Sequence, residues 1–400
     1  MVYSLPSPAA SFDRVVGLDG LRAVAVSLVV AAHLGLSHIV PGGFGVTLFF
    51  FISGLLITRL LLAEWDAEGR IALGKFYIRR LLRLYPALVV AITLGGALTV
   101  AFGGTIFVGE LVALLLYVFN YYGLFLEATI GSADIAAPFG VFWSLSIEEQ
   151  YYALYPMVVG RLAGNPRRFI RSLVIVIVLV LVWRIAIASL HGNHVEERIY
   201  RSTDTRVDSI LYGAVLALIL NGPAAERWTR WASQWRILLL SIGVLIGCFV
   251  LRDPFFRNTV RYSLQGIALM PLVTAICFSS RLAPITRALE SRPAVLIGKW
   301  SYAMYLLHPI AIMVFEQSAL RDMPVASAFG AFALTITAAY LTHHEVERRF
   351  VGLRRTFGSH AGRDSRVPQN RSDREPPITG VGDRALEGSS QSSPQVRLGG

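Results

Sequence analysis

Eleven apolar stretches dominate this sequence, and most are long enough to cross a lipid bilayer as a helix. They lie near residues 18–38, 44–63, 84–102, 107–126, 141–162, 171–190, 207–221, 237–251, 262–279, 296–316 and 324–343. Hydrophobic residues make up 54% of the chain and charged residues only 16%, against about 25% in a soluble domain. Because a soluble chain cannot bury that much apolar surface, we expect an all-α polytopic membrane protein.

The same composition excludes several other classes. The net charge of +11 would fit a nucleic-acid binder if the chain were soluble, but in a membrane protein it reflects arginines in cytoplasmic loops. Cys248 and Cys277 both lie in apolar runs, so neither a disulfide framework nor a metal cluster is indicated. The basic N-terminus resembles a signal peptide, but a second apolar run begins at Phe44 without a small-residue cleavage site, so we expect a retained first span.

Loop charges predict the topology. The loop 66–83 is basic and is placed in the cytoplasm, whereas 127–140 carries acidic residues only and is placed outside. An odd number of crossings must separate them. We therefore expect one of the stretches 84–102 and 107–126 to be a re-entrant or interfacial segment. The result is about ten transmembrane helices with both termini in the cytoplasm.

Two features qualify this count. The loops 191–206 and 252–261 would be external, and yet they carry arginines. The stretches 207–221 and 237–251 are short for a full crossing. We divide the chain into an N-terminal cytoplasmic segment (1–14), a transmembrane domain (15–353) and a cytoplasmic tail (358–400), which we expect to be disordered because it has few apolar residues.

The informative residues are the ionisable ones inside spans, because each costs several kcal/mol unless it faces a cavity or a partner. Arg22 and His33 are eleven residues apart in the first span, so they share one helix face and stand about 16 Å apart along its axis. Arg22 lies toward the cytoplasm and His33 in the outer half. The alternative is that Arg22 reaches the interface and His33 bonds a neighbouring carbonyl.

A second basic site follows in KFYIRRLLRLYP, where Arg80 and Arg83 lie on one helix face. Guanidinium groups bind phosphate in a bidentate manner, so this pair is a candidate phosphate site. Simple anchoring at the cytoplasmic interface is the alternative.

Acidic and titratable groups enter from the other side. Glu148 and Glu149 point about 100° apart on one helix, so we expect one to face a cavity and the other a basic partner. His308 lies in the outer half of its span, where it is a ligand-binding or a core histidine. Trp143 and Tyr151 offer a stacking wall for a ligand or belong to an interfacial aromatic belt.

A further cluster begins the stretch TDTRVDSILYG. Asp204, Arg206 and Asp208 either pair with one another or help to bind a substrate or a developing oxyanion. By the loop count, His33, Glu148 and His308 converge toward the external side, whereas the arginines at 22, 80 and 83 converge toward the cytoplasm. Two clusters of different chemistry on opposite sides favour a path through the protein.

These segments resemble the acyltransferase-3 family, the bacterial membrane O-acyltransferases that modify sugars. The resemblance runs from about Val15 to Leu353. It is carried by the Arg22–His33 pair with ten residues between and by PGGFGVTLFFFISGLLIT, FYIRRLLRLYP, FWSLSIEEQYYALYP, TDTRVDSILYG and SYAMYLLHP.

The resemblance implies ten transmembrane helices in the bacterial inner membrane and an acyl-CoA donor, commonly acetyl-CoA, taken from the cytoplasm. It implies a carbohydrate acceptor, usually a cell-envelope glycan. We expect Arg22, Arg80 and Arg83 to bind the donor, and His33 to act with Glu148 in catalysis. His33 is then a general base or an acylated carrier. No metal or permanently bound cofactor is expected.

The sequence departs from the family pattern in two places. A family segment that usually reads Glu-Arg-Pro here has Arg349 after Glu347 and Arg348. Some members carry a fused periplasmic hydrolase-like domain. The tail of this sequence is too short for one, so we expect transfer to be completed alone or through a separate periplasmic or extracellular partner.

Three other functions stay open at this point. A proton-coupled transporter also has ionisable residues on both sides of the midplane, although no inverted repeat is visible. An acyltransferase for a glycosylated secondary metabolite would take its acceptor from inside. A non-catalytic scaffold leaves the buried charges unexplained.

Overall fold

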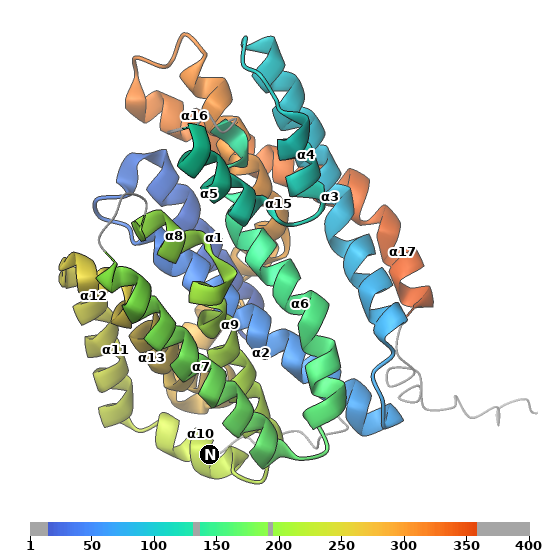
Figure 1. Cartoon of the computed structure of the whole chain (residues 1–400), viewed down its shortest axis with the longest axis vertical. Coiled ribbons are helices and arrows are strands. Elements are labelled where there is room, and N and C mark those ends of the chain that lie inside the picture. Colours follow the sequence, from blue (N-terminus) through green and yellow to red (C-terminus); the bar gives the residue numbers. More distant parts are fainter. Residues whose placement is uncertain (1–14, 131–136, 191–194, 358–400) are drawn as a thin grey trace, which may run out of the picture. The chain divides into compact units, whose positions relative to one another are not determined.

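The computed structural model describes residues 15–130, 137–190 and 195–357, and within them helices are the only regular elements (Figure 1). The predicted N-terminal segment 1–14 and the predicted tail 358–400 lie outside the described residues. The helices are α1 (Leu18–Ala31), α2 (Gly42–Glu68), α3 (Leu73–Ala101), α4 (Val108–Leu115), α5 (Phe119–Ile130), α6 (Phe142–Leu162), α7 (Pro166–Ser189), α8 (Val195–Arg201), α9 (Thr203–Asn221), α10 (Ala225–Ala232), α11 (Trp235–Val250), α12 (Pro254–Asn258), α13 (Val260–Phe278), α14 (Ala283–Leu289), α15 (Arg292–Glu316), α16 (Pro324–Leu341) and α17 (Arg349–Thr356). Four short turns of 3₁₀ or π type accompany them, η1 (Ala32–Leu36), η2 (Ala137–Phe139), η3 (Ser280–Leu282) and η4 (Thr342–Glu347).

The helices show a multi-pass membrane protein. Six segments of the described chain are long and apolar enough to cross a bilayer, namely α1 with η1, α2, α3, α7, α13, and α16 with η4. A seventh is reached if α8–α9 and α10, which are bent by 120° at a short break, count as one span. The all-α prediction is confirmed, because every regular element of the described residues is a helix. Helices suit a bilayer because each one satisfies its backbone hydrogen bonds within itself. The count of ten spans stays a prediction.

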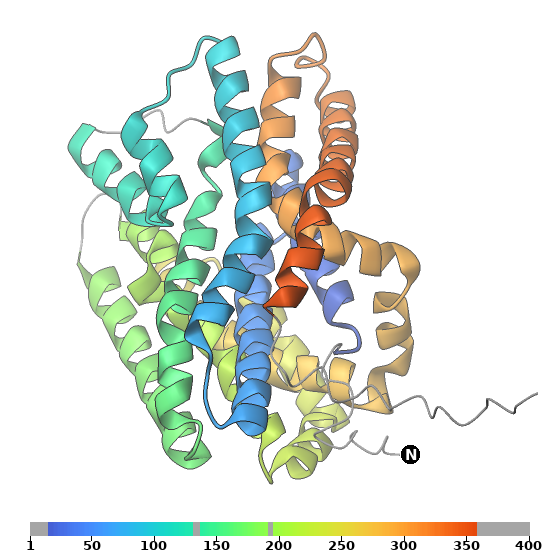
Figure 2. The ribbon, with the colours of Figure 1, turned by 90° about the vertical axis from the view of Figure 1, so that its right-hand side faces the viewer.

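The sequence predicts that one of the stretches 84–102 and 107–126 is irregular, and the structure shows which one. The stretch 84–102 belongs to α3, a continuous helix of 29 residues that is about 43 Å long. The stretch 107–126 is broken into α4, of only eight residues, and α5, with Tyr117 between them at a φ of 54°. Figure 2 shows the long α3 beside these short helices. The second stretch is therefore the irregular one of the two, and its interfacial or re-entrant position stays a prediction.

Local sequence explains where several helices begin. The side chain of Asn165 accepts a hydrogen bond from the backbone N–H of Arg168 at 3.0 Å, and Pro166 follows at the first position of α7. Asp253 caps α12 in the same way, with Pro254 next in the chain. An acceptor side chain satisfies a free N–H of the first turn, and proline has no N–H to satisfy there.

Helices α2 and α9 meet backbone to backbone at two glycines. A Cβ atom added at Gly54 would lie 1.9 Å from the carbonyl oxygen of Ile210, and one added at Gly213 would lie 1.9 Å from that of Phe51. Only glycine permits this approach, which is the usual way in which small residues bring membrane helices together. The packing role expected for the glycines of the PGGFGVTLFFFISGLLIT segment is confirmed at Gly54.

Helix α1 packs against both α2 and α15. Its approach to α15 is equally close, because a Cβ added at Gly298 would lie 1.9 Å from the carbonyl oxygen of Asp19. Helix α1, which carries Arg22 and continues into the η1 turn with His33, therefore has helical partners on two sides.

The crossing of α2 and α9 yields a stability prediction. Gly54→Ala places a methyl group against the backbone of Ile210, which side-chain motion cannot relieve, so we expect a loss of at least about 2 kcal/mol of stability. The measurement is the thermal midpoint of the detergent-purified protein, followed by size-exclusion chromatography. Gly243→Ala in α11 is the control, because no atom lies within 4 Å of its added Cβ, and it should keep or raise the midpoint. Equal midpoints for the two variants would contradict the close crossing.

Candidate active site

A narrow cavity of about 100 Å³ lies between α1, α2, α3, α6 and α15. Its charged lining residues are Arg22, Arg80, Arg83 and Glu148, and we call it the arginine cavity. The structure thus brings together the three arginines that the sequence singled out from two separate helices. Apolar side chains such as Phe49 and Leu56 form much of the remaining wall.

Arg80 is held in place by α6. Its Nη2 donates to Oε1 of Glu149 at 3.0 Å, and its guanidinium carbon lies 3.5 Å from the ring centre of Tyr152. An ion pair and a cation–π contact together fix the direction of a side chain that would otherwise be flexible. The two adjacent glutamates therefore divide as predicted, because Glu149 takes the basic partner and Glu148 lines the cavity.

Glu148 lies on a different side from the one expected. The loop count placed it with His33, but the structure places it in the arginine cavity, where Ser53 Oγ donates to its Oε1 at 2.8 Å. The reason is its depth along α6. Trp143, in the first turn of α6, lines the same cavity as His33, and Glu148 follows five residues later, about 7.5 Å further along the axis.

A second, wider cavity of about 730 Å³ opens at the other end of α1. His33 lines it together with residues of α8, α11, α12 and α13, and we call it the histidine cavity. His33 lies in η1, where Leu34 and Gly35 leave helical geometry, and π turns of this kind are frequent at functional sites. Arg22 and His33, which the sequence predicts to stand far apart along one helix, therefore line two different cavities.

The hydrogen bond of His33 determines which nitrogen is basic. Nδ1 lies 2.9 Å from the carbonyl oxygen of Val29, which can only accept, so Nδ1 carries the proton. In the neutral ring Nε2 then has the lone pair. The sequence offered a hydrogen bond from His33 to a neighbouring carbonyl as an alternative, and Nδ1 makes such a bond. The ring as a whole is nevertheless exposed to the cavity.

His308 of α15 packs against His33. Their ring centres are 5.0 Å apart, and His308 is fully buried. Its Nδ1 donates to the carbonyl oxygen of Met304 at 3.2 Å, and its Nε2 is buried without a hydrogen-bond partner among the described residues. Of the three groups expected to converge, the structure brings the two histidines together and separates Glu148 from them.

Val46 and Tyr305 line both cavities and so form the partition between them. The Tyr305 hydroxyl group donates to the carbonyl oxygen of Val141 at 3.0 Å and is hydrogen-bonded to Ser144 Oγ at 2.6 Å. Ser144 lines the arginine cavity and Val141 the histidine cavity, so the tyrosine is anchored to the walls of both. The sequence pointed to its segment, SYAMYLLHP, but not to Tyr305 itself.

The two aromatic residues that were expected to form a stacking wall lie in different places. Trp143 lines the histidine cavity and packs against Tyr200, with ring centres 4.7 Å apart. Tyr151 lines neither cavity, because its ring is stacked on Tyr155 at 4.5 Å within the core. Trp143 is therefore placed to contact a ligand, whereas the position of Tyr151 gives no support to its predicted role in ligand binding.

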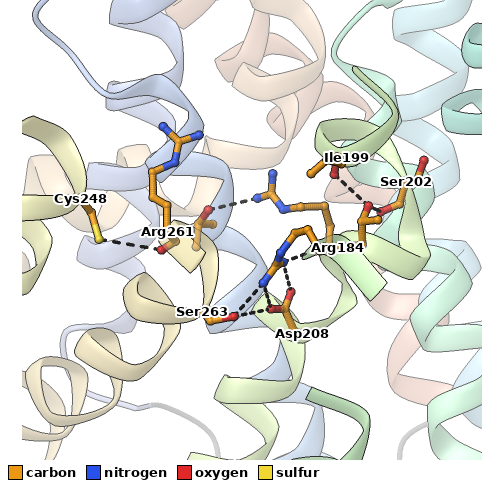
Figure 3. Close-up of polar contacts among 10 residues, drawn as sticks. Arg184, Ile199, Ser202, Asp208, Cys248, Arg261 and Ser263 are labelled. Carbon is orange, nitrogen blue, oxygen red and sulfur yellow. Dashed lines mark hydrogen bonds and ion pairs between the residues drawn. The ribbon is translucent and has the colours of Figure 1, made fainter. Parts of the chain in front are cut away.

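The charged cluster at the start of α9 does not pair with itself. Asp208 accepts hydrogen bonds from both terminal nitrogens of Arg184, at 2.8 and 3.1 Å, and also one from Ser263 (Figure 3). Both partners of this pair are fully buried. Arg184 lies within the apolar run of α7, and its charge there was the signal that sequence reasoning overlooked.

Asp204 and Arg206 have other partners. Asp204 pairs with Arg198 at 2.6 Å and accepts a hydrogen bond from Trp183. Arg206 is fully buried, donates to Thr47 Oγ1 at 3.1 Å and lies 3.9 Å from the ring centre of Tyr262. None of the three α9 residues lines either cavity, so their position indicates a structural role rather than substrate binding.

Within the described residues no cluster of His, Cys, Asp or Glu is placed to hold a metal ion.

Comparisons with known proteins identify the family of this chain. Residues 15–344 match the model of the acyltransferase domain family, Acyl_transf_3. The chain is 32% identical over 347 residues to a putative O-acetyltransferase, SACOL0978, of Staphylococcus aureus strain COL, which covers 84% of this chain and 57% of that protein. It is also 32% identical over 346 residues to the O-acetyltransferase OatA of S. aureus strain NCTC 8325, at 83% and 56% coverage.

The chain thus spans little more than half the length of the curated relatives that it matches. No solved structure matches it significantly. The family match covers both cavities, their partition and every helix from α1 to α16. The chain belongs to the acyltransferase-3 family of membrane acyltransferases.

Proposed function

We propose that this protein transfers an acyl group, commonly acetyl, from acyl-CoA in the arginine cavity to a carbohydrate hydroxyl in the histidine cavity. One observation carries the proposal. Two cavities of different chemistry share the partition made by Val46 and Tyr305, with Arg22 in one and His33 in the other. Relatives named O-acetyltransferases support the chemistry.

The arginine cavity suits the donor. Coenzyme A carries phosphates at one end and a thioester at the end of a long, thin arm. Arg22, Arg80 and Arg83 supply the guanidinium groups that bind phosphate, and the apolar side chains of the same lining suit the arm. Glu148 uses Oε1 to accept from Ser53, so its second oxygen is available to amide N–H groups of the arm.

The histidine cavity supplies the base. With Nδ1 bonded to Val29, Nε2 of His33 takes the proton of the acceptor hydroxyl as the sugar oxygen attacks the thioester carbon. The carbon–sulfur bond then breaks, and the thiolate of CoA leaves and takes up the proton. In the alternative order Nε2 attacks the thioester first and passes the acyl group on to the sugar. His308, 5.0 Å away, supports the ring in either case.

The orientation follows from the donor. Acyl-CoA is a cytoplasmic compound, so the arginine cavity faces the cytoplasm of a bacterial inner membrane and the histidine cavity faces outward. The acceptor is then a cell-envelope glycan, reached directly or through a separate periplasmic or extracellular partner. Both chain termini lie in the cytoplasm under this arrangement.

His33 is the first residue to test. We expect His33→Ala to lower acceptor-dependent thiol release from acetyl-CoA by about 10²- to 10⁴-fold, because the general base is lost, while acyl-CoA binding stays unchanged. The assay uses detergent-purified protein with and without a crude envelope glycan fraction. His344→Ala removes a histidine that lines neither cavity and should retain activity. Near-normal transfer by folded His33→Ala protein would overturn the mechanism.

The partition provides a second test. Val46→Phe fills the wall that the two cavities share, so we expect the rate of transfer to fall by at least about tenfold, with little change in the affinity for acyl-CoA. Val178→Phe on the exposed face of α7 is the matched control, because that valine is 52% exposed and lines neither cavity. A pathway elsewhere would be indicated if both variants transferred at the wild-type rate.

A further inference from the structure

The histidine cavity has an unusual balance of charge. Its lining contains four arginines and two glutamates, namely Arg201, Arg252, Arg257, Arg261, Glu196 and Glu197. Both glutamates are engaged by neighbours in the protein. Glu197 pairs with Arg201 at 2.7 Å, and Glu196 accepts a hydrogen bond from the side chain of Asn258 at 3.2 Å.

The other three arginines come from three consecutive elements. Arg252 follows α11, Arg257 lies on α12 and Arg261 on the first turn of α13. Among the residues that the structure describes, no carboxylate lies within ion-pair distance of any of them. Arg261 donates from its side chain to the hydroxyl group of Tyr262 at 3.2 Å, and its Nε is buried without a hydrogen-bond partner.

Three other arginines of the bundle have carboxylate partners, whereas the buried Arg206 contacts Thr47 and the ring of Tyr262 instead. Arg80 pairs with Glu149, Arg184 with Asp208 and Arg198 with Asp204. Figure 3 draws the Arg261 side chain pointing away from the buried Arg184–Asp208 pair. Positive loop residues are also disfavoured on the outer side of a membrane, where the proposed function places this cavity. Three arginines retained there without counter-charges call for a ligand that supplies one.

The rest of the lining fits a sugar. Trp143 and Tyr200 present aromatic surface to the same cavity as the arginines. Its volume of about 730 Å³ falls within the range of about 300–1,000 Å³ that is typical of ligand sites. Guanidinium groups recognise carboxylate and phosphate in the same planar, bidentate geometry.

We propose that the acceptor is an acidic sugar whose carboxylate or phosphate is bound by Arg252, Arg257 and Arg261. This inference rests on the proposed function, because it names the class of acceptor that the histidine cavity takes. The anionic group orients the sugar ring against the aromatic wall and brings a hydroxyl group toward His33. The arginines on loops that the topology places outside thereby gain a function.

Binding without donor tests the inference separately from catalysis. The protein is placed in nanodiscs of neutral lipid, so that no anionic headgroup competes, and titrated with a galacturonic acid oligomer and with the galactose oligomer of equal length. We expect the acidic oligomer to bind at least about tenfold more tightly, because charge-assisted hydrogen bonds are the stronger ones. Added salt should reduce the difference through screening. Galactose 1-phosphate against galactose distinguishes phosphate from carboxylate.

Single variants assign the effect to residues. Arg252→Gln, Arg257→Gln and Arg261→Gln should each weaken binding of the acidic oligomer by about three- to tenfold and leave the neutral one unchanged. Arg321→Gln is the control, because it removes an exposed arginine, paired with Asp322, that lines neither cavity. Equal binding of acidic and neutral oligomers by the wild type would overturn the proposal.

Two further outcomes separate this inference from the proposed function. Acetyl transfer to neutral glycans that none of the three arginine variants affects would keep the transferase and refute the acidic acceptor. Selective binding of the acidic oligomer without any acyl transfer would support the site and count against the enzyme mechanism. If the variants changed only the binding of added anionic lipid, the arginines would belong to a headgroup site and the proposal would fail.

Discussion

Both cavities depend on the backbone contact between α2 and α9. The contact at Gly54 and Gly213 leaves no room for a side chain, so the two helices are fixed in depth as well as in angle. Helix α2 then carries Val46 to the partition and Ser53 to Glu148, while α9 brings Arg206 against Thr47. A small change at this crossing would move residues in both cavities together.

Charge neutralisation inside the bundle is the second constraint. Removing an ion from water costs several kcal/mol, which a well-formed pair largely offsets. The fully buried pair of Arg184 and Asp208 ties α7 to α9, and Ser263 adds α13 to the same network. The pair of Arg80 and Glu149 ties α3 to α6 at the edge of the arginine cavity. Such pairs add little net stability, but they specify which helices are neighbours and in which register.

The separation of the cavities has a chemical consequence for the proposed reaction. A thioester that met water and sugar in one open space would be hydrolysed as well as transferred. Val46 and Tyr305 separate the two cavities and form the shared wall at which the thioester would meet the acceptor hydroxyl. The hydroxyl group of Tyr305 is held by groups on both walls. The paired rings of His33 and His308 lie beyond this partition. The reacting groups would therefore meet at one place, with bulk water limited to the two outer openings.

The sequence by itself determined the class of protein, the helical nature of its spans and the family. It narrowed the irregular segment to two stretches, 84–102 and 107–126. It also placed Arg22 and His33 on one face, because the helical repeat is local and can be counted along the chain. The division of the adjacent glutamates between a cavity and a basic partner followed from the same repeat.

Only the tertiary structure decided which neighbour each group meets. Glu148 joined the arginines rather than His33, Asp208 paired with Arg184 of another helix, and Tyr151 was buried in a stack with Tyr155. The physical reason is that a helix specifies direction around its own axis, whereas depth and lateral partners are set by packing between helices far apart in sequence. The three arginines 252, 257 and 261, which line the same cavity as His33, are the clearest example, since loop charges alone placed them only on a side of the membrane.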